Sequence, residues 1–183
     1  MILGPDGWIT PCRHVASPNH DERPPGEDLT LLVVHSISLP PGEYGGDAIE
    51  RFFTNGLDPA AHPYFQEICA LKVSSHFLVR RDGELVQFVP TERRAWHAGV
   101  SRWRGRERCN DFSIGVELEG RDDGPFEAAQ YDTLVALVRA LRAGHPLRDI
   151  AAHSDIAPGR KTDPGPFFDW GRLFAGLSAR GAF

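Results

Sequence analysis

Two histidines of this 183-residue chain lie where a folded sheet could use them for chemistry. His35 directly follows the apolar run 29–34, and His153 directly follows the short apolar run 149–152. The end of a strand is a place where a sheet presents rigidly held side chains to a cleft. Taken alone, each histidine is also compatible with a structural role in which hydrogen bonds satisfy its ring nitrogens.

The segment after His153 supplies a third candidate ligand, Asp163. Residues 154–166 show no apolar periodicity and are stiffened by prolines, so this loop can bring Asp163 back toward His153. Two neutral imidazoles and one carboxylate form a three-ligand zinc site whose fourth position is open for water, as in hydrolytic zinc enzymes. The alternative is that Asp163, which precedes Pro164, only shapes a turn.

A glutamate and a lysine add reactive groups near the same elements. Glu117 lies in the strand-like run 112–118, and strand alternation places it on the same face as Glu119. A carboxylate on a strand otherwise built for burial is costly unless it is paired or used. Lys161 is one of only two lysines among 20 basic residues, which favours a specific need for a compact ammonium in the loop.

The elements that must hold these side chains alternate irregularly between strands and helices. Strands are predicted at 29–34, 75–80, 84–89, 112–118 and 149–152, and helices at 47–53, at 128–143 and from 170 onward. The Asp82-Gly83 pair between two strand-like runs predicts a hairpin, which breaks a strict strand–helix–strand alternation. We therefore expect an α/β fold with a mixed central β-sheet flanked by helices.

The length predicts one domain, since a domain takes about 150 residues. Residues 1–28 are rich in proline, aspartate and glycine, and we expect them to wrap the domain as an irregular segment. Residues 29–183 then form one globular unit. Hydrophobic residues make up 41% of the chain and charged residues 25%, which is ordinary for a folded, water-soluble protein.

The overall charge argues against nucleic acid as a partner. The formal net charge is -5 and the isoelectric point is about 5.9, so bulk electrostatics would repel a polyanion. The segment 93–108 is a local exception, because it carries six arginines and a single acid. These arginines form either a solvated loop or a small rim that binds carboxylates of a ligand.

Localisation signals are absent from the sequence. No apolar run approaches the roughly 20 residues needed to cross a bilayer, and the first residues lack the basic and apolar regions of a signal peptide. Three cysteines lie far apart and in odd number, as expected for free thiols in a reducing compartment. We expect a cytoplasmic protein without a membrane partner.

Four sequence blocks resemble those of the AmpD-type zinc-dependent N-acetylmuramoyl-L-alanine amidases. They are Val-His-Ser at 34–36, Ala-Trp-His-Ala-Gly at 95–99, the stretch 105–120 and the stretch 152–165. The similarity extends from about Trp8 to Trp170. It implies that residues 29–183 are a zinc amidase domain with the fold that this family shares with animal peptidoglycan-recognition proteins.

The resemblance also implies roles for individual residues. His35, His153 and Asp163 fall at the positions of the ligands of a single Zn²⁺. Glu117 falls at the position of the catalytic glutamate, and Lys161 at that of the catalytic lysine.

Five further residues fall at positions that the resemblance associates with substrate. Lys72, Arg108 and Arg160 correspond to basic groups presented to the peptide stem, although position 72 is usually arginine in this branch. Trp96 and His97 belong to a signature block and are expected to line the substrate groove. An ordinary solvated or wall-packing role is the alternative for each of the five.

The reaction implied is hydrolysis of the amide between N-acetylmuramic acid, in its 1,6-anhydro form, and L-alanine of the stem peptide. We expect it in cytoplasmic recycling of muropeptides by a monomeric enzyme. The alternatives are a muropeptide sensor without chemistry, an amidase of the polymeric wall outside the cytoplasm, and a zinc hydrolase of an unrelated amide. A glycosidase using Glu117 and Glu119 would leave the histidine, lysine and aspartate residues without a purpose.

Overall fold

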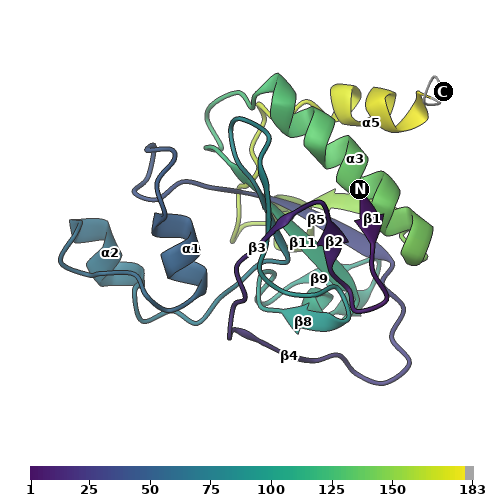
Figure 1. Cartoon of the computed structure of the whole chain (residues 1–183), viewed down its shortest axis with the longest axis horizontal. Coiled ribbons are helices and arrows are strands. Elements are labelled where there is room, and N and C mark those ends of the chain that lie inside the picture. Colours follow the sequence, from purple (N-terminus) through teal and green to yellow (C-terminus); the bar gives the residue numbers. More distant parts are fainter. Residues whose placement is uncertain (180–183) are drawn as a thin grey trace.

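A six-stranded mixed β-sheet forms the centre of the computed structural model, which describes residues 1–179 (Figure 1). Its strands, in sheet order, are β12 (Asp149–Ala152), β5 (Leu31–Ile37), β11 (Ser113–Glu119), β6 (Phe77–Val79), β7 (Leu85–Gln87) and β3 (Arg13–His14). The first four are parallel, whereas β6 and β7 form an antiparallel pair around the Asp82-Gly83 turn. The predicted α/β fold with a mixed central sheet and the predicted hairpin are both confirmed.

The two central strands lie slightly further along the chain than the runs that predict them. The predicted strand 29–34 stops before His35, but β5 includes His35 and continues through Ser36 to Ile37. It continues because β11 still pairs with it there, with Glu119 opposite Ile37. All seven residues of β11 are buried, since helices and loops cover both faces of the sheet.

One face of the sheet is covered by α3 (Ala128–Gly144), on which α5 (Trp170–Ser178) packs (Figure 1). Apolar side chains recur along one side of α3, and Leu134, Val138 and Leu141 enter the main core with no exposed surface. Burying each such side chain contributes about 1.5–3 kcal/mol. Both helices agree with the sequence prediction.

The opposite face carries α1 (Ala48–Phe53) and α2 (Pro63–Ile68), which lie together at the left of Figure 1. Their side chains form a second core with strand residues that point away from α3, such as Leu78 and Val86. The short helix α4 (His153–Ile156) follows β12 directly and belongs to a third, smaller core. The functional side chains described below lie on this second face.

Helix α1 agrees with the helix predicted at 47–53, whereas α2, also of six residues, is not predicted from the sequence. Its start nevertheless has a local signal. Pro63 occupies the first turn, where a missing N–H costs nothing, and the His62 Nδ1 accepts a hydrogen bond from Tyr64 N–H at 3.1 Å.

The N-terminal segment 1–28 is less irregular than predicted. It contains β1 (Ile2–Leu3), β2 (Ile9–Thr10) and β4 (His20–Glu22) besides β3. Strands β1 and β2 pair with each other, whereas β3 and β4 pair with strands distant in sequence, β4 with β8 (Arg93–Ala95). None of them is long enough to show an alternating pattern in the sequence. The division into 1–28 and 29–183 stays a prediction, and residues 180–183 lie outside the described part of the chain.

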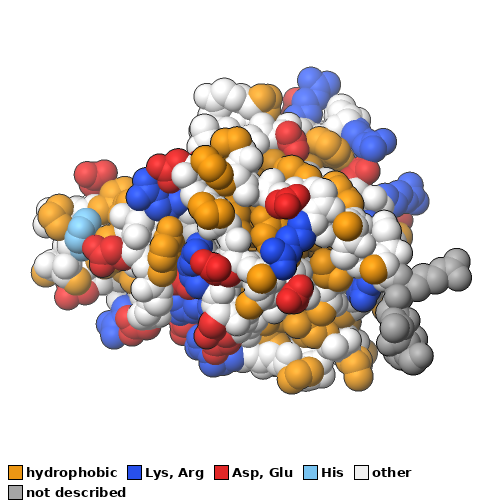
Figure 2. All heavy atoms as spheres, turned by 90° about the horizontal axis from the view of Figure 1, so that it is seen from above, with side chains coloured by type: hydrophobic (Ala, Val, Ile, Leu, Met, Phe, Trp, Pro, Cys, Tyr) orange, Lys and Arg blue, Asp and Glu red, His pale blue; other side chains and the backbone are white. Residues whose placement is uncertain are grey.

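Two further short strands, β9 (Arg102–Trp103) and β10 (Arg106–Glu107), form a small antiparallel ladder that precedes a 3₁₀ turn at Cys109–Asp111. Within residues 1–179, no helix is both long and apolar enough to cross a membrane. On the face shown in Figure 2, basic and acidic side chains are interspersed, and neither sign forms a continuous patch there.

Candidate active site

Strand register brings the candidate catalytic residues to one place. In the parallel pair β5–β11, Glu117 lies directly opposite His35. In the parallel pair β5–β12, Ala152 lies opposite Val34, so the next residue, His153, follows the end of β12 at the level of His35. Three residues far apart in sequence therefore meet at the carboxyl ends of three adjacent parallel strands, where α/β proteins place their sites.

The loop after α4 returns Asp163 to these strand ends. Its Oδ2 lies 3.0 Å from His153 Nδ1 and 3.2 Å from His35 Nδ1, and the two Nδ1 atoms are 2.9 Å apart. One donor atom from each of the three residues can be chosen so that all lie within 4.8 Å of one another. Two imidazoles and a carboxylate in this arrangement can hold a metal ion of the zinc type.

Hydrogen bonding outside the cluster supports this use of His153. Its Nε2 lies 3.2 Å from the carbonyl oxygen of Ala98. Because a carbonyl oxygen can only accept, Nε2 carries the proton in the neutral ring and Nδ1 presents its lone pair to the cluster. A neighbouring backbone carbonyl thus sets the tautomer that a metal ligand needs.

The protonation states of His35 and Asp163 are also those that metal binding requires. Burial lowers the pKa of His35 to about 4, although the contact with Asp163 opposes this shift. Burial acts to raise the pKa of Asp163, but contacts with His153 and His35 outweigh burial and lower that pKa. At neutral pH His35 is therefore neutral and Asp163 is charged, ready to bind a cation without first losing protons.

Glu117 is the unusual group beside this cluster. Its side chain is buried, with 8% of the residue exposed, and its Oε2 lacks a hydrogen-bond partner within the described chain. Burial, followed by the nearby charge of Asp163, raises the pKa of Glu117 well above its usual value, and the positive charge of Lys161 opposes the rise. A buried, unpaired carboxyl group with a raised pKa in a cleft is characteristic of a general acid–base.

The cleft that contains these groups has a volume of about 680 Å³. At one side lie the cluster residues together with Glu117 and Lys161, and at the other side lies an apolar wall. The wall comes from α1, α2 and the segment after α2, and includes Phe52, Phe53, Tyr64, Ile68, Leu71 and Val73. Such a cleft fits an elongated ligand with both polar and apolar parts. The apolar wall was not predicted from the sequence, because helix α2 was not predicted.

Asp122 is a second feature that the sequence did not reveal. Its Oδ1 accepts a hydrogen bond of 2.6 Å from Ser36 Oγ, and its Oδ2 accepts one from the hydroxyl of Thr162. Ser36 follows His35, whereas Thr162 lies between Lys161 and Asp163. The Asp122 carboxylate therefore ties the end of β5 to the loop that carries the third candidate ligand, Asp163.

Two of the five predicted substrate residues line the cleft, namely Trp96 and His97. The His97 ring contacts the ligand candidate His35, with 2.9 Å between His97 Nδ1 and His35 Nε2. His97 therefore contacts His35 of the candidate metal-binding group and also lines the cleft. Whether either residue touches substrate stays a prediction.

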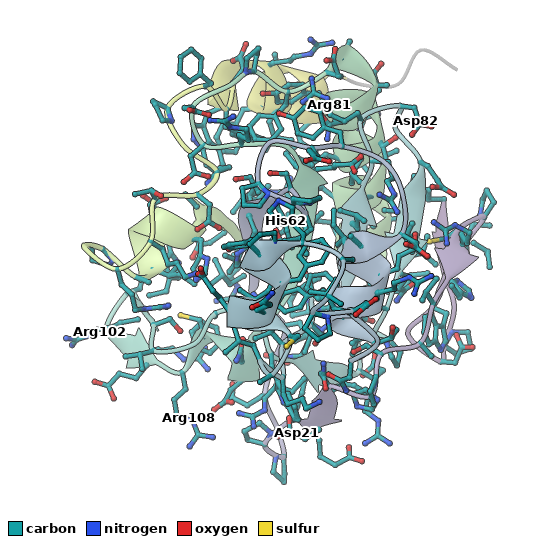
Figure 3. The ribbon with its side chains drawn as sticks, turned by 90° about the vertical axis from the view of Figure 1, so that its left-hand side faces the viewer. Asp21, His62, Arg81, Asp82, Arg102 and Arg108 are labelled. Atoms are coloured by element: carbon teal, nitrogen blue, oxygen red, sulfur yellow. The ribbon has the colours of Figure 1, made fainter. Side chains whose placement is uncertain are left out.

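The other three, Lys72, Arg108 and Arg160, are exposed and are not among the residues lining the cleft in the described chain. Arg108 projects from the body of the molecule (Figure 3) and pairs with Asp111 at 3.1 Å. Arg160 donates hydrogen bonds to two backbone carbonyls of the 98–100 segment. Their contact with a peptide stem stays a prediction.

Most of the arginines of segment 93–108 are paired with acidic side chains. Five of the six make ion pairs within the described chain, and Arg102 extends outward at the edge of the molecule (Figure 3). The pairs are Arg93–Glu22, Arg94–Asp21, Arg104–Asp149, Arg106–Glu27 and Arg108–Asp111. The two interpretations from the sequence, a solvated loop and a carboxylate-binding rim, both stay predictions.

Comparison with known protein families identifies the class of protein to which this fold and this site belong. The chain belongs to the N-acetylmuramoyl-L-alanine amidase family, whose model matches residues 25–166. It is 59% identical to the 1,6-anhydro-N-acetylmuramyl-L-alanine amidase AmpD of Enterobacter cloacae, over 97% of this chain and 96% of that protein. The AmpD of Escherichia coli strain K12 is also 59% identical, over 94% of this chain and 95% of its own length.

Solved structures agree with this assignment. A crystal structure of a selenomethionine AmpD derivative superposes with a TM-score of 0.94 at 55% identity, covering 97% of this chain and all of that one. A complex of the amidase AmiD from E. coli superposes with a TM-score of 0.60 at 32% identity, covering 88% of this chain and 58% of that one. That complex contains anhydro-N-acetylmuramic acid-L-Ala-D-gamma-Glu-L-Lys. The predicted resemblance and the predicted fold are confirmed.

Proposed function

We propose that this protein hydrolyses the amide bond between 1,6-anhydro-N-acetylmuramic acid and the L-alanine of a stem peptide, with one zinc ion bound by His35, His153 and Asp163. The observation that carries the proposal is the position of Glu117, which is buried, unpaired and directly across the strand pair from His35. The substrate is inferred from two relatives that are similar over nearly the whole chain and are named for this reaction.

The ligand set fits zinc better than magnesium or calcium. Magnesium and calcium prefer shells made of oxygen atoms, whereas this cluster offers two imidazole nitrogens and a single carboxylate. Three protein ligands leave a coordination position open, as in hydrolytic sites. Bound zinc would supply Lewis-acid chemistry, activating water and polarising the scissile carbonyl group.

Glu117 would move the protons of the reaction. As a carboxylate it takes a proton from the attacking water while the water oxygen bonds to the carbonyl carbon. As a carboxylic acid it then gives that proton to the alanine nitrogen while the carbon–nitrogen bond breaks. Water is consumed, and the products are the lactyl carboxylic acid and the free amine. A raised pKa suits both steps, because one group must accept and donate near neutral pH.

Lys161 would stabilise charge at the carbonyl oxygen. It lines the same cleft as the cluster and Glu117, and its ammonium carries a positive charge on an exposed, movable stem. Negative charge develops on the carbonyl oxygen as the water adds. One well-placed donor to such an oxygen typically contributes about 2.7–4 kcal/mol to transition-state stabilisation.

The proposal extends to cytoplasmic recycling of muropeptides by a monomeric enzyme that binds neither nucleic acid nor membrane. Its support is of three kinds. The relatives are named for the 1,6-anhydro form of the sugar, the three cysteines are free thiols, and the net charge is negative.

Variants of the cluster and of Glu117 separate zinc binding from catalysis. His153→Ala and Asp163→Ala are expected to lose stoichiometric zinc, measured by metal analysis after gel filtration, together with activity. Glu117→Ala is expected to keep zinc and to lose about 10²–10⁴-fold in turnover, the usual contribution of a general acid–base. A Glu117→Ala protein with near-native turnover would contradict the acid–base role, and an Asp163→Ala protein with full zinc would contradict the ligand assignment.

A further inference from the structure

His97 lies between the metal cluster and strand β11. One ring nitrogen, Nδ1, is 2.9 Å from His35 Nε2, and the other, Nε2, is 3.2 Å from Ser113 Oγ. The ring covers Gly115, where an added Cβ would lie 2.6 Å from the imidazole. Glycine at this strand position therefore makes room for the ring, at a small cost in strand stability.

The donor and acceptor in each of these hydrogen bonds follow from the bond between Ser113 and Cys109. Ser113 Oγ lies 2.6 Å from the carbonyl oxygen of Cys109, which can only accept, so the hydroxyl proton of Ser113 is used there. Toward His97 the Ser113 oxygen must then accept, and His97 Nε2 is the donor. The chain of bonds has a defined direction from this point onward.

The His97 ring is neutral, because within residues 1–179 its nitrogens hydrogen-bond no carboxylate and a buried, unpaired charge is expensive. With its proton on Nε2, His97 offers a lone pair at Nδ1 and accepts from His35 Nε2. That bond keeps the His35 proton on Nε2 and leaves the lone pair of His35 Nδ1 directed at Asp163 and His153. The direction set at the Cys109 carbonyl is thereby transmitted to the cluster.

We propose that His97 is a positioning residue for the metal site, fixing the tautomer and ring orientation of His35 through a chain that runs from Cys109 through Ser113. The proposal rests on the zinc site proposed above. It gives His97 a role different from the substrate contact expected from the sequence. The Ala98 carbonyl oxygen fixes the tautomer of His153 in the same way, so the Nε2–H of each of the two histidines has a hydrogen-bond acceptor.

Substitutions at position 97 test this role because they separate ring volume from hydrogen bonding. His97→Phe fills the space but offers no acceptor to His35. His97→Asn places an amide oxygen near the former Nδ1 and restores an acceptor. Ser113→Ala removes the anchor at the far end of the chain without touching His35. His145→Asn is the matched control, because His145 contacts Thr91 and not the cluster.

The first readout is the zinc dissociation constant, measured by competition with a chromophoric chelator on protein whose fold is checked by circular dichroism. His97→Phe is expected to weaken zinc binding about 10–100-fold, the range typical of lost outer partners of metal ligands. His97→Asn should recover most of that loss, Ser113→Ala should show a smaller loss than His97→Phe, and His145→Asn should bind like wild type.

The second readout is the steady-state kinetics at saturating zinc. A positioning role predicts that His97→Phe lowers kcat and leaves KM unchanged. A raised KM with wild-type zinc affinity would overturn the proposal in favour of substrate contact, and so would equal zinc affinity in all variants. Failure of the proposed function is distinguishable, because wild-type protein would then bind no zinc or bind it without turnover.

Discussion

Glu117 shows at the scale of one residue how a reactive group acts against the stability of its own fold. The strand register that places it opposite His35 also buries it, and no described side chain offers its Oε2 a hydrogen bond. Burial raises the pKa of Glu117 because the charged form is poorly solvated there. Carrying the charge at neutral pH therefore costs folding free energy.

This cost predicts that Glu117→Gln stabilises the zinc-free protein at neutral pH. Below about pH 4.5, the ordinary pKa of glutamate, the carboxyl group is neutral in both folded and unfolded chains, and the two proteins should not differ through this charge. As the pH rises, only the unfolded chain ionises freely, so wild type loses stability relative to Glu117→Gln until the pH passes the raised pKa of the folded state.

Thermal unfolding of zinc-free protein between pH 4 and pH 8 measures this effect. The difference in Tm between Glu117→Gln and wild type should grow with pH and then level off. Glu67→Gln, an exposed substitution of the same charge on α2, is the control and should show no such trend. A Tm difference independent of pH would show that the carboxyl group titrates normally.

Some residues of the site could be predicted from the sequence, and others could not. His35 and Glu117 could be predicted from their places on apolar strands, where a polar side chain needs a reason. Asp163 could be selected only through a loop and a resemblance. Asp122 could not be found at all, because a carboxylate that accepts two hydroxyl groups from distant segments leaves no local pattern.

At the scale of elements, the site depends on holding a loop against the end of a strand. Asp122 accepts hydrogen bonds from Ser36 on β5 and from Thr162 in the loop. The backbone also approaches closely there, since an added Cβ at Gly165 would lie 2.0 Å from the Asp122 carbonyl oxygen. This contact fixes Lys161 and Asp163 relative to His35.

Asp122→Ala is therefore expected to lower turnover about 10–100-fold, because displacements of about 1 Å among catalytic groups have effects of this size. Zinc affinity should fall as well, since the loop carries a ligand. Asp132 is exposed on α3 and is not among the residues that line the cleft, so Asp132→Ala should retain wild-type zinc affinity and turnover. Equal effects of the two substitutions would contradict the clamping role of Asp122.

The predictability of the elements follows their length and the turn signals beside them. The long helix α3 and the strands β5 and β11 carry enough apolar positions to be recognised from the sequence alone, and the Asp82-Gly83 turn indicates the short strands β6 and β7. Short strands without such a signal, such as β9 and β10, depend on partners and have no period of their own. The six-residue helix α2 falls in the same class, and with it the apolar wall of the cleft.

At the scale of the whole molecule, zinc would join three segments of the fold, namely β5, the start of α4 and the loop that follows α4. A ligand that binds only the folded state stabilises it by mass action. At free zinc about 100-fold above its dissociation constant, the gain is about 2.7 kcal/mol. For a chain of this size that corresponds to an increase in Tm of about 5–10 °C.

Calorimetry of chelator-treated protein with and without added zinc measures this stabilisation. Wild type should gain several degrees in Tm, and the gain should increase with free zinc concentration. Asp163→Ala should show no dependence on zinc at the same concentrations, because one of its three ligands is missing. An equal zinc-dependent gain in both proteins would place the binding site elsewhere.

Mass spectrometry of the reaction products shows whether zinc-loaded protein cleaves the amide bond between the sugar and L-alanine. The protein is incubated with 1,6-anhydro-N-acetylmuramyl-tripeptide, with and without a zinc chelator. The expected result is free tripeptide and anhydro-N-acetylmuramic acid in equal amounts, formed only without the chelator and restored by added zinc. Intact substrate with zinc-loaded wild-type protein, or cleavage at another bond, would contradict the proposed function.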